Sequence, residues 1–338
     1  MSISGKLWTP LSATVFLIAG TVLNASCSRS SKPEDTAYVA PASLKLRSST
    51  AQVSNIVGEL KGGDRITIVG RSYGVDGKPW FKIKGPKEAW AEARYFVNAK
   101  IVEESRHIAD QYKDTQTQAV AKSKASLKLR LTPDRTDDTN VATLLPENTI
   151  LEVLGRERKL KPTTTVVEAE GGAATNKGPV YDSWLLVRLR DYAVLPAGWI
   201  YGGSVEFEIP ADIIYFASSG RRITGWQRLS QANEENGKSG ADYLVLERKL
   251  LGADEQADFD RVKILAYDPT TREYTTPFRE DLSGRFPVSL KMEGKRGRFK
   301  IPVIEKNNDT KLVAFDVELF DDGKVKVTSG DKAVGSRQ

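Results

Sequence analysis

The chain has 338 residues, of which 40% are hydrophobic and 28% are charged, and its formal net charge is +6. This length exceeds that of one average domain and predicts two or three. The 15 prolines and 27 glycines, most of them at the ends of short apolar runs, favour strands joined by turns over long helices. Because Cys27 is the only cysteine, a fold that depends on a disulfide within the chain is excluded.

The first residues have the three-part form of an export signal. Lys6 provides a positive charge, residues 11–23 form an apolar run, and two small residues precede Cys27. The run is shorter than the ~20 apolar residues of a spanning helix. A cysteine directly after such a segment resembles the acylation site of bacterial lipoproteins, although Asn24 stands where that family favours leucine. The resemblance implies a lipid on Cys27, with ordinary cleavage or an uncleaved anchor as alternatives.

All three alternatives place most of the chain outside the cytoplasm. By the lipoprotein resemblance, Ser28 after the cysteine, where no aspartate retention signal stands, implies the periplasmic side of the outer membrane or the cell surface. The positive net charge suits an anionic partner such as cell-wall polymer or lipid headgroups. Export argues against nucleic acid as a partner.

A hexapeptide, Ala-Ser-Leu-Lys-Leu-Arg, occurs at residues 42–47 and again at residues 125–130, and the segments after the two copies are also parallel. The repeat indicates a duplicated module. In each copy leucines alternate with basic residues, which is the period of a half-buried strand. We therefore expect the leucines to face two cores and the basic residues to face solvent. The leucines are Leu44, Leu46, Leu127 and Leu129, and the basic residues are Lys45, Arg47, Lys128 and Arg130.

The order of apolar runs and turns predicts the division of the chain. Residues 1–27 are the export segment and 28–36 a tether. The first module covers residues 37–97, a helical linker 98–123, and the second module 124–208 with an inserted loop at 159–179.

The remaining residues, 209–332, predict a third, mostly antiparallel β domain. Residues 226–236 favour a short helix or a loop. Residues 286–292 and 297–304 form one expected strand pair. Residues 312–327 form a second, with its turn at Asp321-Asp322-Gly323, because Asp-Gly is a strong hairpin signal.

Both modules resemble bacterial SH3-like domains. The motifs that carry the resemblance are Leu44-Lys45-Leu46-Arg47, Gly58-Glu59-Leu60-Lys61-Gly62-Gly63, Trp80-Phe81 and Ala89-Trp90-Ala91, with counterparts in the second copy. The sequence departs from the family pattern where Lys45 and Lys128 replace asparagine, where Ala89 replaces glycine, and in the second turn, which lacks glycine. The resemblance implies two small SH3-like barrels in tandem. Together with the short helical linker and the C-terminal antiparallel β domain expected from the apolar runs, it gives a mainly β chain.

In that family, peptide or cell-wall ligands lie in a groove between barrel loops, edged by aromatic side chains. The residues at matching positions are Tyr73, Trp80, Trp90, Tyr95, Trp184, Tyr192, Trp199 and Tyr201. The four tryptophans lie in apolar runs, which favours a place in the core over a place in a binding site. The two loop residues Tyr73 and Tyr192 are the ones expected to be exposed.

The reactive residues argue against an enzyme. His107, the only histidine, lies in the predicted linker helix without a neighbouring nucleophile motif, and Cys27 lies at the export junction. No zinc-ligand spacing, phosphate loop or dinucleotide motif is present, so neither metal nor cofactor is expected. The enzymatic hypothesis that remains is a carboxylate-based hydrolase in the C-terminal domain.

The sequence therefore predicts a non-catalytic protein of the cell envelope. It is held at a membrane through Cys27 and binds peptidoglycan or a wall-associated peptide. A scaffold subunit of an envelope protein complex is the alternative, with the barrels packed on each other and on protein partners.

Overall fold

The computed structural model describes most of the chain after the predicted export segment. The described residues are 35–85, 88–136, 138–161, 181–192, 194–230, 240–252, 256–305 and 307–330. Cys27, the export segment and most of the inserted loop lie outside them. No helix in the described residues is long and apolar enough to cross a membrane.

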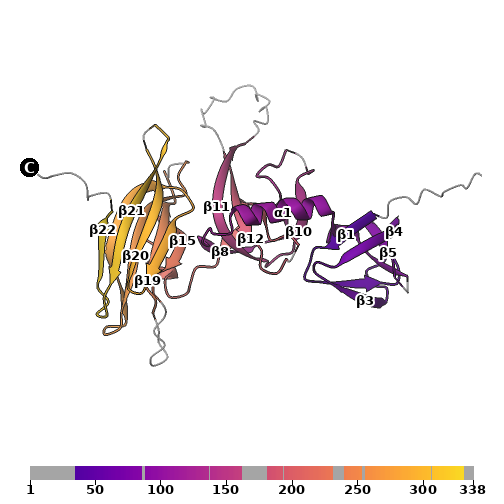
Figure 1. The fold of residues 1–338 in the computed structure, drawn as a ribbon, viewed down its shortest axis with the longest axis horizontal. Coiled ribbons are helices and arrows are strands. Elements are labelled where there is room, and N and C mark those ends of the chain that lie inside the picture. The colour runs from indigo at the N-terminus through magenta and orange to yellow at the C-terminus, as the bar shows by residue number, and fades with distance from the viewer. Residues whose placement is uncertain are drawn as a thin grey trace, which may run out of the picture. The chain divides into compact units, whose positions relative to one another are not determined.

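The chain is mainly β, as expected, and its described residues form three antiparallel sheets and one α-helix (Figure 1). The strands of the first sheet have the order β3-β2-β6-β5-β4-β1-β7. Their bounds are β1 (Asp35–Val39), β2 (Ser43–Arg47), β3 (Ile56–Lys61), β4 (Arg65–Tyr73), β5 (Pro79–Ile83), β6 (Ala89–Glu92) and β7 (Phe96–Val97). We refer to residues 35–97 as the first module. Its first strand begins inside the predicted tether, since Asp35 and Thr36 of β1 pair with Ile68 and Thr67 of β4.

The second sheet repeats the first, strand for strand, in the order β10-β9-β13-β12-β11-β8-β14. Its strands are β8 (Ala119–Ser123), β9 (Leu127–Arg130), β10 (Val141–Leu145), β11 (Ile150–Leu160), β12 (Tyr181–Arg188), β13 (Ala197–Tyr201) and β14 (Val205–Phe207). We refer to residues 119–207 as the second module. It starts before the predicted boundary at 124, since β8 is the counterpart of β1 and pairs with β11.

The helix α1 (Ala99–Gln111) lies between the two modules in the sequence. The Asn98 side chain caps it by accepting a hydrogen bond of 2.9 Å from the Ile101 amide. Val102 and Ser105 are buried, and Ser105 Oγ donates to the Ala197 carbonyl at 2.6 Å. His107 is on the exposed face of this helix, as expected of a surface position.

The repeated hexapeptides occupy β2 and β9, and their four leucines are buried as predicted. Lys45 and Lys128 are exposed, and Arg47 is half-buried. The prediction was wrong for Arg130, which is 5% exposed. Its guanidinium donates to Asn140 Oδ1 at 2.6 Å and to Asp138 Oδ1 at 2.8 Å, so the loop after the strand folds over it.

The third sheet has the order β15-β16-β17-β18-β20-β21-β22, with β19 paired to β20. Its strands are β15 (Arg221–Arg228), β16 (Tyr243–Lys249), β17 (Phe259–Asp268), β18 (Glu273–Gly284), β19 (Ser289–Glu293), β20 (Arg296–Ile304), β21 (Thr310–Leu319) and β22 (Val325–Ser329). Both predicted strand pairs are confirmed, and Gly323 in the second turn has a φ of 75°.

The start of the segment predicted as a short helix or loop, residues 226–236, is instead the end of β15. Trp226 pairs with Val245 and is buried. We refer to residues 210–329 as the C-terminal domain.

The buried apolar residues form three clusters, which differ in size and in how many parts of the chain they include. The first module has a small cluster of its own around Leu44, Leu46 and Ile66. The largest cluster joins residues of α1 and the second module, such as Leu129, to Trp226 and Tyr243 of the C-terminal domain. The third lies within the C-terminal domain. The second module therefore shares its core with the C-terminal domain, whereas most core residues of the first module form their own cluster and its Ala40 and Val97 join the largest one.

Leu129→Ala should lower the free energy of unfolding by about 2–5 kcal/mol, because the side chain is wholly buried in the largest cluster. Equilibrium denaturation in urea measures the change. Val75→Ala is the matched control, since that side chain is fully exposed and its loss should change stability by no more than about 0.5 kcal/mol. Equal effects of the two changes would contradict the packing described.

Candidate binding groove

The structure separates the eight predicted aromatic residues into three groups. Tyr73 is exposed as expected, although it is the last residue of β4 and not a loop residue. Trp80, Trp184 and Tyr192 are buried. The remaining four are half-buried, and they are Trp90, Tyr95, Trp199 and Tyr201.

The expectation that Tyr192 is exposed was wrong. Its side chain is 8% exposed and belongs to the largest core cluster. The loop that carries it folds back on itself, since the Leu189 amide donates to the Pro196 carbonyl and the Leu195 amide to the Tyr192 carbonyl. Burial also raises the pKa of the Tyr192 hydroxyl. Tyr192 is therefore a structural residue of the second module.

A groove of about 440 Å³ on the first module brings two of the predicted residues together, Trp80 from β5 and Tyr95 from the 3₁₀ turn at Ala93–Tyr95. Tyr73 and Trp90 do not line it. The other lining residues come from β2, β6 and the loops beside them, and they are Pro41, Ser43, Leu44, Lys45, Arg47, Gln52, Ala91, Glu92 and Arg94. The groove combines aromatic surface with three basic residues and one acid.

The acid of the groove is Glu92, whose side chain is 4% exposed. Gln52 Nε2 donates to Glu92 Oε1 at 2.6 Å, and Arg94 Nε lies 2.7 Å from Glu92 Oε2. The Arg94 guanidinium in turn lies 4.8 Å from the centre of the Tyr95 ring and donates to the Tyr95 hydroxyl at 2.8 Å. A guanidinium held between a carboxylate and an aromatic face loses little freedom when a ligand arrives.

Trp80 adds a polar group to the same place. Its Nε1 is buried and has no hydrogen-bond partner among the described residues. A buried donor without an acceptor costs about 1–3 kcal/mol. A Cβ at Gly74 would lie 2.8 Å from this nitrogen, so the turn above the indole needs a residue without a side chain.

The sequence did not identify the polar and charged members of the groove. Lys45 was expected only to face solvent, and Gln52, Glu92 and Arg94 were not singled out. A local signal for Glu92 exists, since it directly follows the apolar Ala89-Trp90-Ala91 run. The sequence does not show that the loop with Gln52 contacts Glu92, because that contact forms only in the folded chain.

The equivalent basic residues of the second module are engaged by acids. Asp138 accepts hydrogen bonds from Lys128 and Arg130, which lower the pKa of its carboxyl group. Arg135 lies 2.8 Å from the buried Asp182 and stacks over the Tyr201 ring. The two modules therefore share strand order and differ in the charge that they present.

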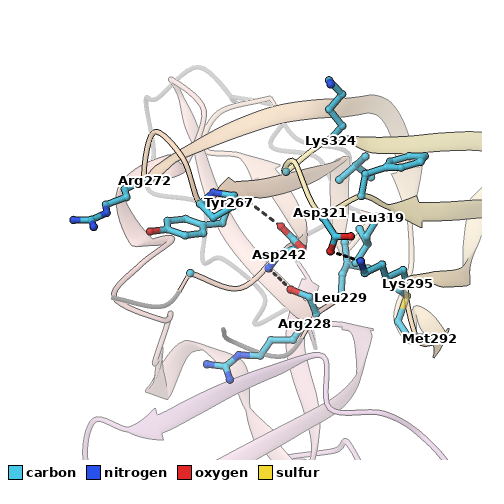
Figure 2. Close-up of a pocket in the computed structure, with 17 residues that line it drawn as sticks. Arg228, Leu229, Asp242, Tyr267, Arg272, Met292, Lys295, Leu319, Asp321 and Lys324 are labelled. Carbon is cyan, nitrogen blue, oxygen red and sulfur yellow. Dashed lines mark hydrogen bonds and ion pairs between the residues drawn. The ribbon is translucent and has the colours of Figure 1, made fainter. Parts of the chain in front are cut away.

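The C-terminal domain has a larger cavity of about 850 Å³ (Figure 2). Asp242 Oδ1 accepts from the Tyr267 amide at 2.9 Å, and the Asp242 amide donates to Ser230 Oγ at 2.9 Å. Asp321 forms an ion pair with Lys295 across the cavity wall. Both carboxylates hold strand ends and turns in place. Both acids among the described residues that line the cavity therefore have partners within the domain.

No group of three or more His, Cys, Asp or Glu side chains suited to a metal ion is found among the described residues. No protein-family model matches the chain, and no curated protein matches it. Among solved structures, the chain is similar to the structure of NlpC2 from Trichomonas vaginalis at 9% identity, over 88% of this chain and 96% of that chain, with a TM-score of 0.17. A TM-score this low does not establish a common fold, so the similarity assigns neither a family nor an activity.

Nitration with tetranitromethane should modify Tyr73 and leave Tyr192 unmodified in the folded protein. The reagent attacks phenolate. The Tyr192 hydroxyl is buried and its pKa is raised, so little phenolate forms there, whereas the Tyr73 side chain is 73% exposed. Peptide mass spectrometry reports each site. Tyr215, which is 91% exposed, is the positive control, and modification of Tyr192 before unfolding would contradict its burial.

Proposed function

We propose that this chain is a non-catalytic binding protein of the cell envelope, held at a membrane by a lipid on Cys27. Its first module, an SH3-like barrel, takes peptidoglycan or a wall-associated peptide in the groove between Trp80 and Tyr95. The observation that carries the proposal is this groove, in which aromatic faces, basic side chains and the buried carboxylate of Glu92 line one concave surface.

The chemistry of the groove suits a peptide with both kinds of charge. Lys45 and Arg47 attract carboxylates, and the paired Arg94 and Glu92 add one group of each sign to the wall. The half-buried Tyr95 ring adds apolar contact at low entropic cost, and the Trp80 side chain, which is 3% exposed, backs the groove as part of the core. A peptide cross-linked into cell wall carries free carboxylates and amines, so it presents each of the groups that this groove complements.

In this proposal the two modules have different roles. The first module binds, and the second holds it to the rest of the chain through the shared core. The continuity of that core also favours a second candidate, a scaffold subunit that packs on protein partners. Wall binding by the purified protein separates the two functions.

Lys45→Gln should weaken sedimentation of the protein with insoluble peptidoglycan by roughly three- to tenfold, because it removes a cation that lines the groove. The measurement is the bound fraction at increasing amounts of wall material. Lys311→Gln is the control, since it makes the same change of net charge at an exposed position of β21.

Equal weakening by the two changes would assign the binding to net charge and exclude the groove. Absence of binding by the unchanged protein at moderate salt would remove the wall ligand and leave the scaffold function.

Cys27→Ser should abolish incorporation of labelled fatty acid and release the protein from the membrane fraction, since the thiol is the acylated group in this proposal. Metabolic labelling and fractionation measure both effects. Ser28→Ala serves as the neighbouring control, and labelling that persists in Cys27→Ser would rule out acylation at this residue.

A further inference from the structure

Two loops of the first module hold apolar side chains in solvent. The loop after β2, residues 48–55, carries Val53, which is 96% exposed, and the turn after β4, residues 74–78, carries Val75, which is fully exposed. Tyr73, the last residue of β4, is 73% exposed beside that turn. Single exposed apolar residues are common, whereas a contiguous apolar patch marks a site of contact with a protein or a membrane.

The two loops touch each other, so the three side chains lie at one end of the module. A Cβ at Gly74 would lie only 3.0 Å from the Thr50 carbonyl oxygen. The Arg47 guanidinium donates to the Ser54 carbonyl at 2.9 Å, which fixes the loop after β2 and holds its valine away from the core. We refer to Val53, Tyr73 and Val75 as the apolar tip.

The chain enters the first module at the same end. β1 and β4 are antiparallel neighbours (Figure 1), and Asp35, the first residue of β1, pairs with Ile68. Because the strands are antiparallel, the start of β1 lies toward the end of β4, which is Tyr73. The Asp35 carboxylate accordingly forms an ion pair of 2.5 Å with Arg71, two residues before that end.

We propose that the apolar tip is a membrane-contact surface, which inserts into the headgroup region of the bilayer. This inference rests on the proposed lipid on Cys27. Asp35 follows Cys27 by eight residues, which span at most about 29 Å. Since the chain enters the module beside the tip, a lipid on Cys27 holds the tip close to the bilayer and raises its local concentration there.

The charges beside the tip are paired, so the contact does not depend on anionic lipid. Arg71 pairs with Asp35, and Lys78 Nζ lies 2.6 Å from Asp76 Oδ2. The contact is instead driven by burial of the two valines and by the tyrosine, whose apolar ring and polar hydroxyl suit the boundary between water and hydrocarbon. Added salt should therefore change it little.

The test places a fluorescent nitrobenzoxadiazole label on a thiol introduced by Val75→Cys in the lipid-bearing protein. In phosphatidylcholine vesicles that contain a lipid with a nitroxide near its headgroup, the label at position 75 should be quenched, and its emission should shift to shorter wavelength. Arg65→Cys is the matched control, since it places the same label at an exposed position at the opposite end of β4. The label at position 65 should be neither quenched nor shifted.

Val53→Asn in the protein labelled at position 75 removes a second apolar group of the tip. It should lower the quenched fraction roughly threefold, because less apolar surface enters the bilayer. Leu312→Asn is its control, since Leu312 is 56% exposed on β21 of the C-terminal domain and its loss should leave the quenching unchanged.

Fatty-acid labelling of the same preparations separates this inference from the proposed anchor. If Cys27 carries a lipid and the label at position 75 is quenched no more than the label at position 65, the membrane contact is overturned and the anchor stands. If Cys27 carries no lipid, the anchor fails. The Cys27→Ser forms of both labelled proteins are then attached to vesicles of nickel-chelating lipid through a histidine tag directly before Ser28. Quenching at position 75 alone supports the contact, and quenching at both positions or at neither overturns it.

Discussion

Gln118 is the residue on which the arrangement of the chain depends. It is wholly buried, and its backbone amide donates to the Val153 carbonyl of the second module at 2.7 Å. Its backbone carbonyl accepts from the Trp226 amide at 2.8 Å, and its side-chain amide both donates to and accepts from the backbone of Val288. Each of these groups would cost about 1–3 kcal/mol if left buried and unpaired. The second module and the C-terminal domain are therefore joined by interactions that form together.

This joint explains why two copies of one module have different properties. The second copy shares its apolar cluster with α1 and with the C-terminal domain. The buried side chain of Tyr192 is part of that cluster. Most core residues of the first copy form their own cluster, although Ala40 and Val97 join the shared one, and its groove is lined by residues of its own strands and loops. The two copies of the fold therefore differ: the second packs against the C-terminal domain, and the first has an open groove.

Local patterns predicted the parts of the fold that local interactions determine. The hairpin at Gly323 follows from the φ of 75° that its turn requires, and the buried leucines follow from their alternation. Strands β1 and β8 were missed because both are short and are identified by partners far along the chain. Arg156, Arg222 and Arg248 line one cavity, and no periodicity in the sequence connects such distant positions.

The position of one acid accounts for the difference in charge between the modules. In both copies the arginine of the hexapeptide holds the loop that follows, Arg47 through the Ser54 carbonyl and Arg130 through Asn140. In the second copy that loop also carries Asp138, which engages both basic residues of the strand. In the first copy the acid is Glu92 on β6, and it is engaged by Gln52 and Arg94. Lys45 and Arg47 therefore line the groove, and in the proposed function a ligand carboxylate takes the place there that Asp138 holds in the second module.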